Sequence, residues 1–239
     1  MVAHLASSGE FITHAKSRMD SSGVVHHSFL ERFEFQRLSR DQLRRFAIQW
    51  YKTARAHKRA FPVLVYNTVD DDVRFELIDI LNEEYGSGNR DMIHGRLLLR
   101  FLAALGISEE DVDDAAALPC VSVFSQEVLA TWRDAEPVRA FGLHFALEYL
   151  AASLHAHFSR GLKKYPFLSA DQRLYFDYHE VAEQRHADFS ELGMETYARD
   201  SSNRALLDVG IDQGIRLMTS LWTGFEEHVL TEPEAKTRV

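Results

Sequence analysis

Hydrophobic residues recur along this chain at helical spacing. Apolar positions stand three and four residues apart through most of its length, and no segment shows the alternation typical of a half-buried strand. The pattern predicts helices from Leu43 to the Pro62 region, from about 91 to 105, from about 108, and over 71–85, 136–161, 169–197 and 204–229. We therefore expect an all-α bundle of seven or eight helices forming one domain over 1–239, with an N-terminal helix or extension over 1–25 and a tail over 230–239.

Polar residues mark several boundaries of these helices. The stretches 39–42 and 169–172 have the form of capping boxes, in which Ser and Gln satisfy the free backbone groups of a helix start. Pro62 is expected to kink or end its helix, and the turn 86–89 to end the helix before it. Cys120 follows Pro119 and is expected in a loop.

Composition narrows the functional classes. The chain has 239 residues, a formal net charge of −9 and a single cysteine. One cysteine cannot form an internal disulfide or a cysteine-rich zinc module, and the negative charge argues against a nucleic-acid binder. No signal peptide and no apolar run of about 18 residues stands out, so a cytoplasmic protein outside the membrane is expected.

The helix over 71–85 carries acids on two faces. Its apolar face ends in Glu84, which is therefore expected to point inward. Glu76, Asp79 and Glu83 fall on a neighbouring face and are expected in solvent. An inward Glu at a helix end also fits a partly exposed cap or an ion-pair partner, so Glu84 alone does not decide between these roles.

Two further polar residues lie on apolar faces. His94 is in line with the leucines of its helix, a position that by itself favours a hydrogen-bonded core histidine over a ligand. Glu148 stands in the middle of a helix that is apolar almost all round. A buried ionised carboxylate is costly unless it is paired or binds a metal. Because no Lys or Arg lies within four residues of Glu148, the alternatives are a distant ion pair or a metal.

The segment 179–186 holds the most specific pattern. His179, Glu183 and His186 stand at i, i+4 and i+7, which places them on one helical face, with about 10 Å of axial rise between the histidines. One helix can thus supply ligands to two neighbouring metal ions. A polar face with two incidental histidines is the alternative. The chain lacks the second Glu-x-x-His pair of ferritin-like bundles, although carboxylates and imidazoles on facing helices suit di-iron or di-manganese sites.

These residues resemble the heme-oxygenase-like di-iron oxidase and oxygenase superfamily, which includes the CADD, pyrroloquinoline quinone synthase and TenA groups. The stretches 82–88, 94 and 101–107 resemble its first ligand segment, and 27–43 its opening helices. The resemblance covers roughly residues 27–228. It implies a heme-oxygenase-like fold and two iron ions, or a manganese and an iron ion. The implied ligands are Glu84, His94, Glu148, His179, Glu183 and His186.

The resemblance implies an enzyme that uses O2 to oxidise a small organic molecule by hydroxylation, N-oxygenation, desaturation or C–C cleavage, in cofactor or secondary metabolism. It also implies a homodimer. Candidates for supporting roles around the metals are His144, His155, Tyr149 and Tyr175. The alternatives are a metal-free oxidase, as in the pyrroloquinoline quinone synthase group, and a non-enzymatic helical interaction module. The inward carboxylates favour the metal enzyme over both.

At some positions this sequence departs from the pattern of particular groups within the superfamily. The segment 57–59 reads His-Lys-Arg where some N-oxygenating members carry a further Glu, so a seventh carboxylate ligand is not expected. Members that make p-aminobenzoate consume their own Tyr and use a nearby Lys, but no Lys follows Glu148 before Lys163. Cys120 does not match the TenA nucleophile. Fatty acids, amino acids and guanidino compounds all remain open as substrates. An arginine in the pocket would indicate a carboxylate, and Arg90, Arg96 and Arg139 are the arginines considered.

Overall fold

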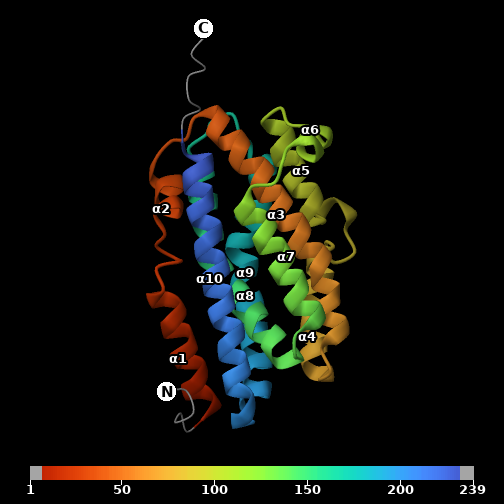
Figure 1. The fold of residues 1–239 in the computed structure, drawn as a ribbon. Coiled ribbons are helices and arrows are strands. Elements are labelled where there is room, and N and C mark those ends of the chain that lie inside the picture. Colours follow the sequence, from red (N-terminus) through yellow and green to blue (C-terminus); the bar gives the residue numbers. More distant parts are fainter. Residues whose placement is uncertain (1–6, 232–239) are drawn as a thin grey trace.

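A computed structural model describes residues 7–231, apart from the side chains of residues 183 and 184. Within this range the regular elements are all helical (Figure 1). They are α1 (Ser8–Ser21), α2 (Ser28–Phe35), α3 (Arg40–Asn67), α4 (Asp71–Glu84), η2 (Arg90–Met92), α5 (His94–Ala104), α6 (Glu109–Asp114), α7 (Pro119–Asp134), α8 (Pro137–Leu162), α9 (Ala170–Ala198), η3 (Ser201–Asn203) and α10 (Arg204–Val229). The all-α prediction is confirmed, and most of the predicted tail lies outside the described residues.

The predicted capping boxes form at the starts of α3 and α9. The hydroxyl of Ser39 accepts the backbone N–H of Gln42, whose side chain accepts the N–H of Ser39 in return. Ser169 and Gln172 make the same exchange at the start of α9. Each box satisfies two backbone donors that would otherwise lack partners. These two long helices, which carry much of the site, therefore begin where the sequence indicates.

The structure corrects the expected course of the chain at two helices. The helix α3 does not end at Pro62 but continues to Asn67, because the neighbouring Phe61 and Leu64 are buried and their packing offsets the hydrogen bond that proline removes. The helix α7 was not predicted, and Cys120 lies in its first turn rather than in a loop. No side chain caps the start of α7, so only Pro119 signals it in the sequence. The described part of the chain thus holds ten α-helices instead of seven or eight.

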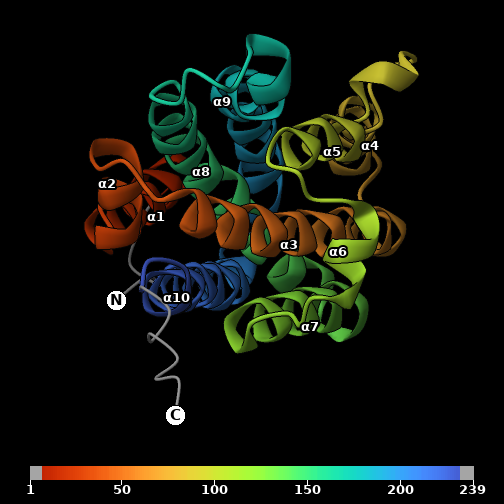
Figure 2. The same cartoon turned by 90° about the horizontal axis from the view of Figure 1, so that it is seen from above.

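The most apolar helix, α8, lies at the centre and packs along both α9 and α10. Seen from above, α3 runs between α8, α9 and α5 on one side and α10 and α7 on the other (Figure 2). Buried aromatic rings, among them Phe46, Phe158 and Trp222, fill the space between these layers. None of the helices in residues 7–231 is long and apolar enough to cross a membrane.

Glycines let α8 and α10 approach until their backbones touch. A Cβ atom at Gly142 would lie 2.3 Å from the carbonyl oxygen of Leu207, and one at Gly210 would lie 2.3 Å from that of Arg139. No side chain fits at either position, so the crossing is fixed by backbone contact. This contact holds the helix that carries Glu148.

We expect Gly210→Ala to lower the free energy of unfolding by about 1–3 kcal/mol, because the added methyl forces two helix backbones apart. Urea unfolding followed by circular dichroism measures this change. The control is Gly9→Ala in α1, where a Cβ would meet nothing within 4 Å and stability should stay within about 1 kcal/mol of wild type. Equal effects of the two variants would contradict the close crossing.

Candidate metal centre

The first group of candidate ligands forms where α4 turns into α5. The last residue of α4 is Glu84, and His94 opens α5. Between them Gly86 adopts a φ of +83°, and a Cβ there would lie 2.2 Å from the carbonyl oxygen of Asn89. Only glycine permits this turn. It returns the chain so that His94 Nδ1 lies 2.8 Å from Glu84 Oε1.

The helix α9 completes this group with His179. Its Nε2 lies 3.6 Å from Glu84 Oε1, and its Nδ1–H donates to the carbonyl oxygen of Tyr175 at 2.7 Å. That bond fixes the orientation of the ring and leaves Nε2 facing the carboxylate. One ligand atom from each of Glu84, His94 and His179 lies within 4.8 Å of the others, a spacing that a single metal ion can span. We call these three residues cluster A.

A second group lies two turns further along α9. His186 Nδ1 lies 3.5 Å from Glu148 Oε2, and His144 Nδ1 lies 3.6 Å from the other oxygen of the same carboxylate. Ser190 places its hydroxyl 3.1 Å from His144 Nε2. We call Glu148 and His186 cluster B. The predicted ligand Glu183 stands between the histidines on α9, but its side chain lies outside the described residues.

Glu83 is not in solvent, as its position on α4 suggested, but buried with 8% of its surface exposed. Its carboxylate accepts a hydrogen bond from His186 Nε2 at 2.7 Å and forms an ion pair with Arg185. The last turn of α4 packs against α9, so the face that carries Glu83 is covered as well as the face that carries Glu84. The pattern of one helix cannot show how many neighbours cover its end.

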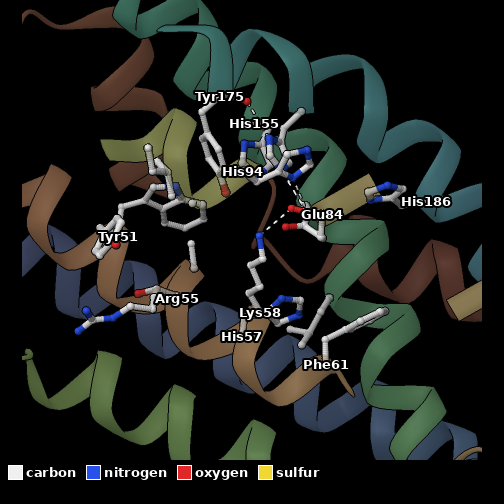
Figure 3. Close-up of a pocket in the computed structure, with 18 of the residues that line it drawn as sticks. Tyr51, Arg55, His57, Lys58, Phe61, Glu84, His94, His155, Tyr175 and His186 are labelled. Carbon is white, nitrogen blue, oxygen red and sulfur yellow. Dashed lines mark hydrogen bonds and ion pairs between the residues drawn. The ribbon is translucent and has the colours of Figure 1, made fainter. Parts of the chain in front are cut away.

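A cavity of about 280 Å³ opens beside both clusters (Figure 3). The helix α3 forms one wall and contributes Lys58, whose Nζ donates to the backbone carbonyl of Glu84 at 2.6 Å and lies 4.2 Å from the ring centre of Tyr85. Much of the rest is apolar, with Trp50, Phe124, Leu147, Met218 and Leu221 among the lining residues. Arg55 also lines the cavity, whereas Arg90, Arg96 and Arg139 are not among its lining residues.

The residues predicted to have supporting roles lie in three different places relative to the cavity and the clusters. His155 and Tyr175 line the cavity, and their rings lie 4.6 and 4.1 Å from that of His179. His144 lies against Glu148, fully buried. Tyr149 lies away from the clusters and donates its hydroxyl to Asp20 on α1 at 3.0 Å.

Burial and hydrogen bonding compete at the two carboxylates. Burial alone would raise the pKa of Glu148, but the hydrogen bond of His186 and the charge of His144 outweigh it and hold the pKa at about 2. Burial likewise opposes ionisation of Glu84, whose contacts with His179 and His94 hold its pKa well below the usual value. At neutral pH both groups are therefore charged.

The pKa values of two neighbouring imidazoles are also lowered, but here burial is the main cause, because it disfavours the charged form of the ring. It lowers the pKa of His94 and brings that of His144 to about 4. Neutral imidazoles beside ionised carboxylates are the protonation states that metal ligands require. Mixed nitrogen and oxygen donors suit iron or manganese, so both clusters fit such an ion by their donor chemistry.

Comparison with known protein families and sequences places the chain among redox enzymes. The family model described as "Iron-containing redox enzyme" matches residues 44–211. A 4-aminobenzoate synthase of Chlamydia pneumoniae is 26% identical over 227 residues, which cover 90% of this chain and 94% of the relative. A 4-chloro-allylglycine synthase of Streptantibioticus cattleyicolor is 23% identical over 220 residues, which cover 92% of this chain and 84% of the relative.

Solved structures share the fold at low identity. A CADD-like protein of unknown function from Nostoc punctiforme superposes with a TM-score of 0.77 at 14% identity, covering 94% of this chain and 99% of that one. A domain with a heme oxygenase-like fold from Shewanella denitrificans gives a TM-score of 0.67 at 13% identity, covering 92% and 91%. The predicted heme-oxygenase-like fold is thereby confirmed.

The lowered pKa of His144 predicts a loss of stability in acid. The metal-free unfolded chain takes up a proton at this residue below pH 6.5, whereas the folded chain does so only near pH 4. Stability from this group should therefore fall as the pH drops from 6.5 to 4.5, by roughly 2–3 kcal/mol. Urea unfolding in chelator over this range measures the slope. In His144→Gln the slope should become shallower, and an unchanged slope would count against the neutral buried imidazole.

Proposed function

The chain belongs to the family of iron-containing redox enzymes, and from this premise we propose that it is a di-iron oxidase or oxygenase. It would use O2 to oxidise a small organic molecule. One observation carries the proposal: α9 presents one histidine to each of two carboxylates, Glu84 and Glu148, beside a single cavity. Two such positions on one helix are the arrangement that a pair of metal ions needs in a bundle core.

The proposed ligand sets follow the two clusters. Glu84, His94 and His179 would hold one ion, and Glu148 and His186 the other, with Glu183 as its third protein ligand. Bound iron would supply the redox chemistry with O2. The chain's own part is to hold the ligands in place, to keep their protonation states, and to surround the reacting groups with an apolar wall that limits water.

The charged residues that line the cavity support a proposal about the charge of the substrate. Its acidic lining residues, Glu84 and Glu148, belong to the clusters, whereas Arg55, Lys58 and Arg59 bring positive charge along α3. Burial lowers the pKa of Lys58, which the charge of Glu84 opposes. An anionic group on the substrate would offset this cationic wall. We therefore propose an organic carboxylate with an apolar body.

A second candidate is suggested by the same lysine. The helix of Glu148 carries no Lys, but Lys58 reaches the cavity from α3. Tyr51 of α3 and Tyr175 of α9 line the same cavity. A lysine and tyrosines in one cavity are what the resemblance to p-aminobenzoate-forming members requires, and relatives from Chlamydia bear the name 4-aminobenzoate synthase. Formation of 4-aminobenzoate from the chain's own side chains is therefore the alternative.

We expect the protein reconstituted anaerobically with Fe(II) to hold about two iron ions per chain and to develop a transient visible absorption with O2. Glu84→Ala and His186→Ala should each lose iron, as measured by elemental analysis. The control is His26→Ala, at an exposed position outside the cavity. Full iron content in both ligand variants would contradict the site. The mass of the intact chain after O2 exposure separates the candidates: an unchanged mass supports an external substrate, and loss of a tyrosine side chain supports the alternative.

Lys58→Met should weaken binding of carboxylate probes by about tenfold or more, equivalent to about 1.4 kcal/mol. Suitable probes are straight-chain C6 to C10 monocarboxylates and the alcohols of equal length, measured by calorimetry on iron-loaded protein. The carboxylates should bind better than the alcohols in wild type, and the alcohols should bind both proteins equally. Lys52→Met, on the same helix but not lining the cavity, is the control. Equal binding of acids and alcohols to wild type would refute the anionic substrate.

A further inference from the structure

The two histidines of α9 are oriented by different partners. His179 donates its Nδ1–H to a carbonyl of its own helix, that of Tyr175. His186 instead lies between two carboxylates from other helices. Its Nδ1 faces Glu148 at 3.5 Å, and its Nε2 lies 2.7 Å from Glu83 Oε2. The orientation of this ring therefore depends on Glu83.

The contact with Glu83 selects the tautomer of His186. An ionised carboxylate can only accept a hydrogen bond, so at 2.7 Å the proton of a neutral ring stands on Nε2. The lone pair then stands on Nδ1, which points toward Glu148. Histidines that bind metals usually donate their second ring N–H to a carboxylate or a carbonyl in this way.

Glu83 is held for this task by a second contact. Its other carboxylate oxygen pairs with Arg185, the residue before His186 on α9. Glu83 lies across the imidazole from Glu148, because Nδ1 and Nε2 are on different sides of the ring. It is also absent from the residues that line the cavity, unlike Glu84. These positions suit a group that acts through His186 rather than one that contacts a cation.

We propose that Glu83 is the positioning residue of cluster B, which fixes His186 with Nδ1 directed toward Glu148, the side on which a metal ion would bind. The proposal rests on the metal centre of the proposed function. It gives the adjacent glutamates of α4 different tasks: Glu84 serves cluster A as a direct ligand, and Glu83 serves cluster B through a histidine. The alternative is an ion pair that only fastens α4 to α9.

Anaerobic titration with Co(II) tests the proposal, because visible absorption and calorimetry follow each binding step without any need for activity. Wild type should bind two ions per chain. Glu83→Gln should bind one ion with wild-type affinity and the other about 10- to 100-fold more weakly. Glu83→Asp, which keeps the carboxylate, should recover part of this loss. Glu76→Gln, at a half-exposed acid of the same helix, should match wild type.

The outcomes separate the proposals. An unchanged second affinity in Glu83→Gln would overturn the positioning role. So would equal weakening of both steps together with a lower Tm of the metal-free protein, because that pattern indicates a fastening ion pair. Binding of fewer than two ions by wild type would overturn the di-metal proposal itself, and the inference with it. Selective weakening of one step at an unchanged metal-free Tm supports the positioning role.

Discussion

The charge of two carboxylates inside an apolar bundle is the constraint on which the site depends. Glu84 and Glu148 stay ionised although burial opposes it, and each does so through nearby imidazoles. Burial disfavours the cationic form of two of these imidazoles, those of His94 and His144. Among the side chains described in residues 7–231, the Glu148 carboxylate forms ion pairs with His144 and His186. Negative charge is thus compensated only weakly, which makes the clusters receptive to a cation.

The helical periodicity of the sequence was enough to predict which polar residues face the core. It placed Glu84, His94 and Glu148 on inward faces and His179 and His186 on a common face, and the structure gathers all five around one region of the bundle. Periodicity failed one residue earlier, at Glu83. A face that is polar in the sequence can still be covered when two neighbours pack at one helix end, and that depends on tertiary structure.

The other differences also follow from contacts distant in sequence. The helix α3 continues past Pro62 because its neighbours Phe61 and Leu64 are buried, although proline tends to end a helix. No side chain caps the start of α7, so no polar residue in the sequence indicates where this helix begins. Lys58 reaches the cavity from α3, so a search along α8 could not find it. Relatives of this chain bear unlike enzyme names, which agrees with the rule that one fold can host many functions.

The adjacency of Glu83 and Glu84 has a mechanical consequence. A single peptide unit joins them, so their side chains are separated by about 100° of rotation and about 1.5 Å of rise on one rigid helical turn. A shift of that turn that changes the contact of Glu84 with His94 also changes the contact of Glu83 with His186. The end of α4 therefore joins the surroundings of the two clusters, because one helical turn carries a residue of each contact.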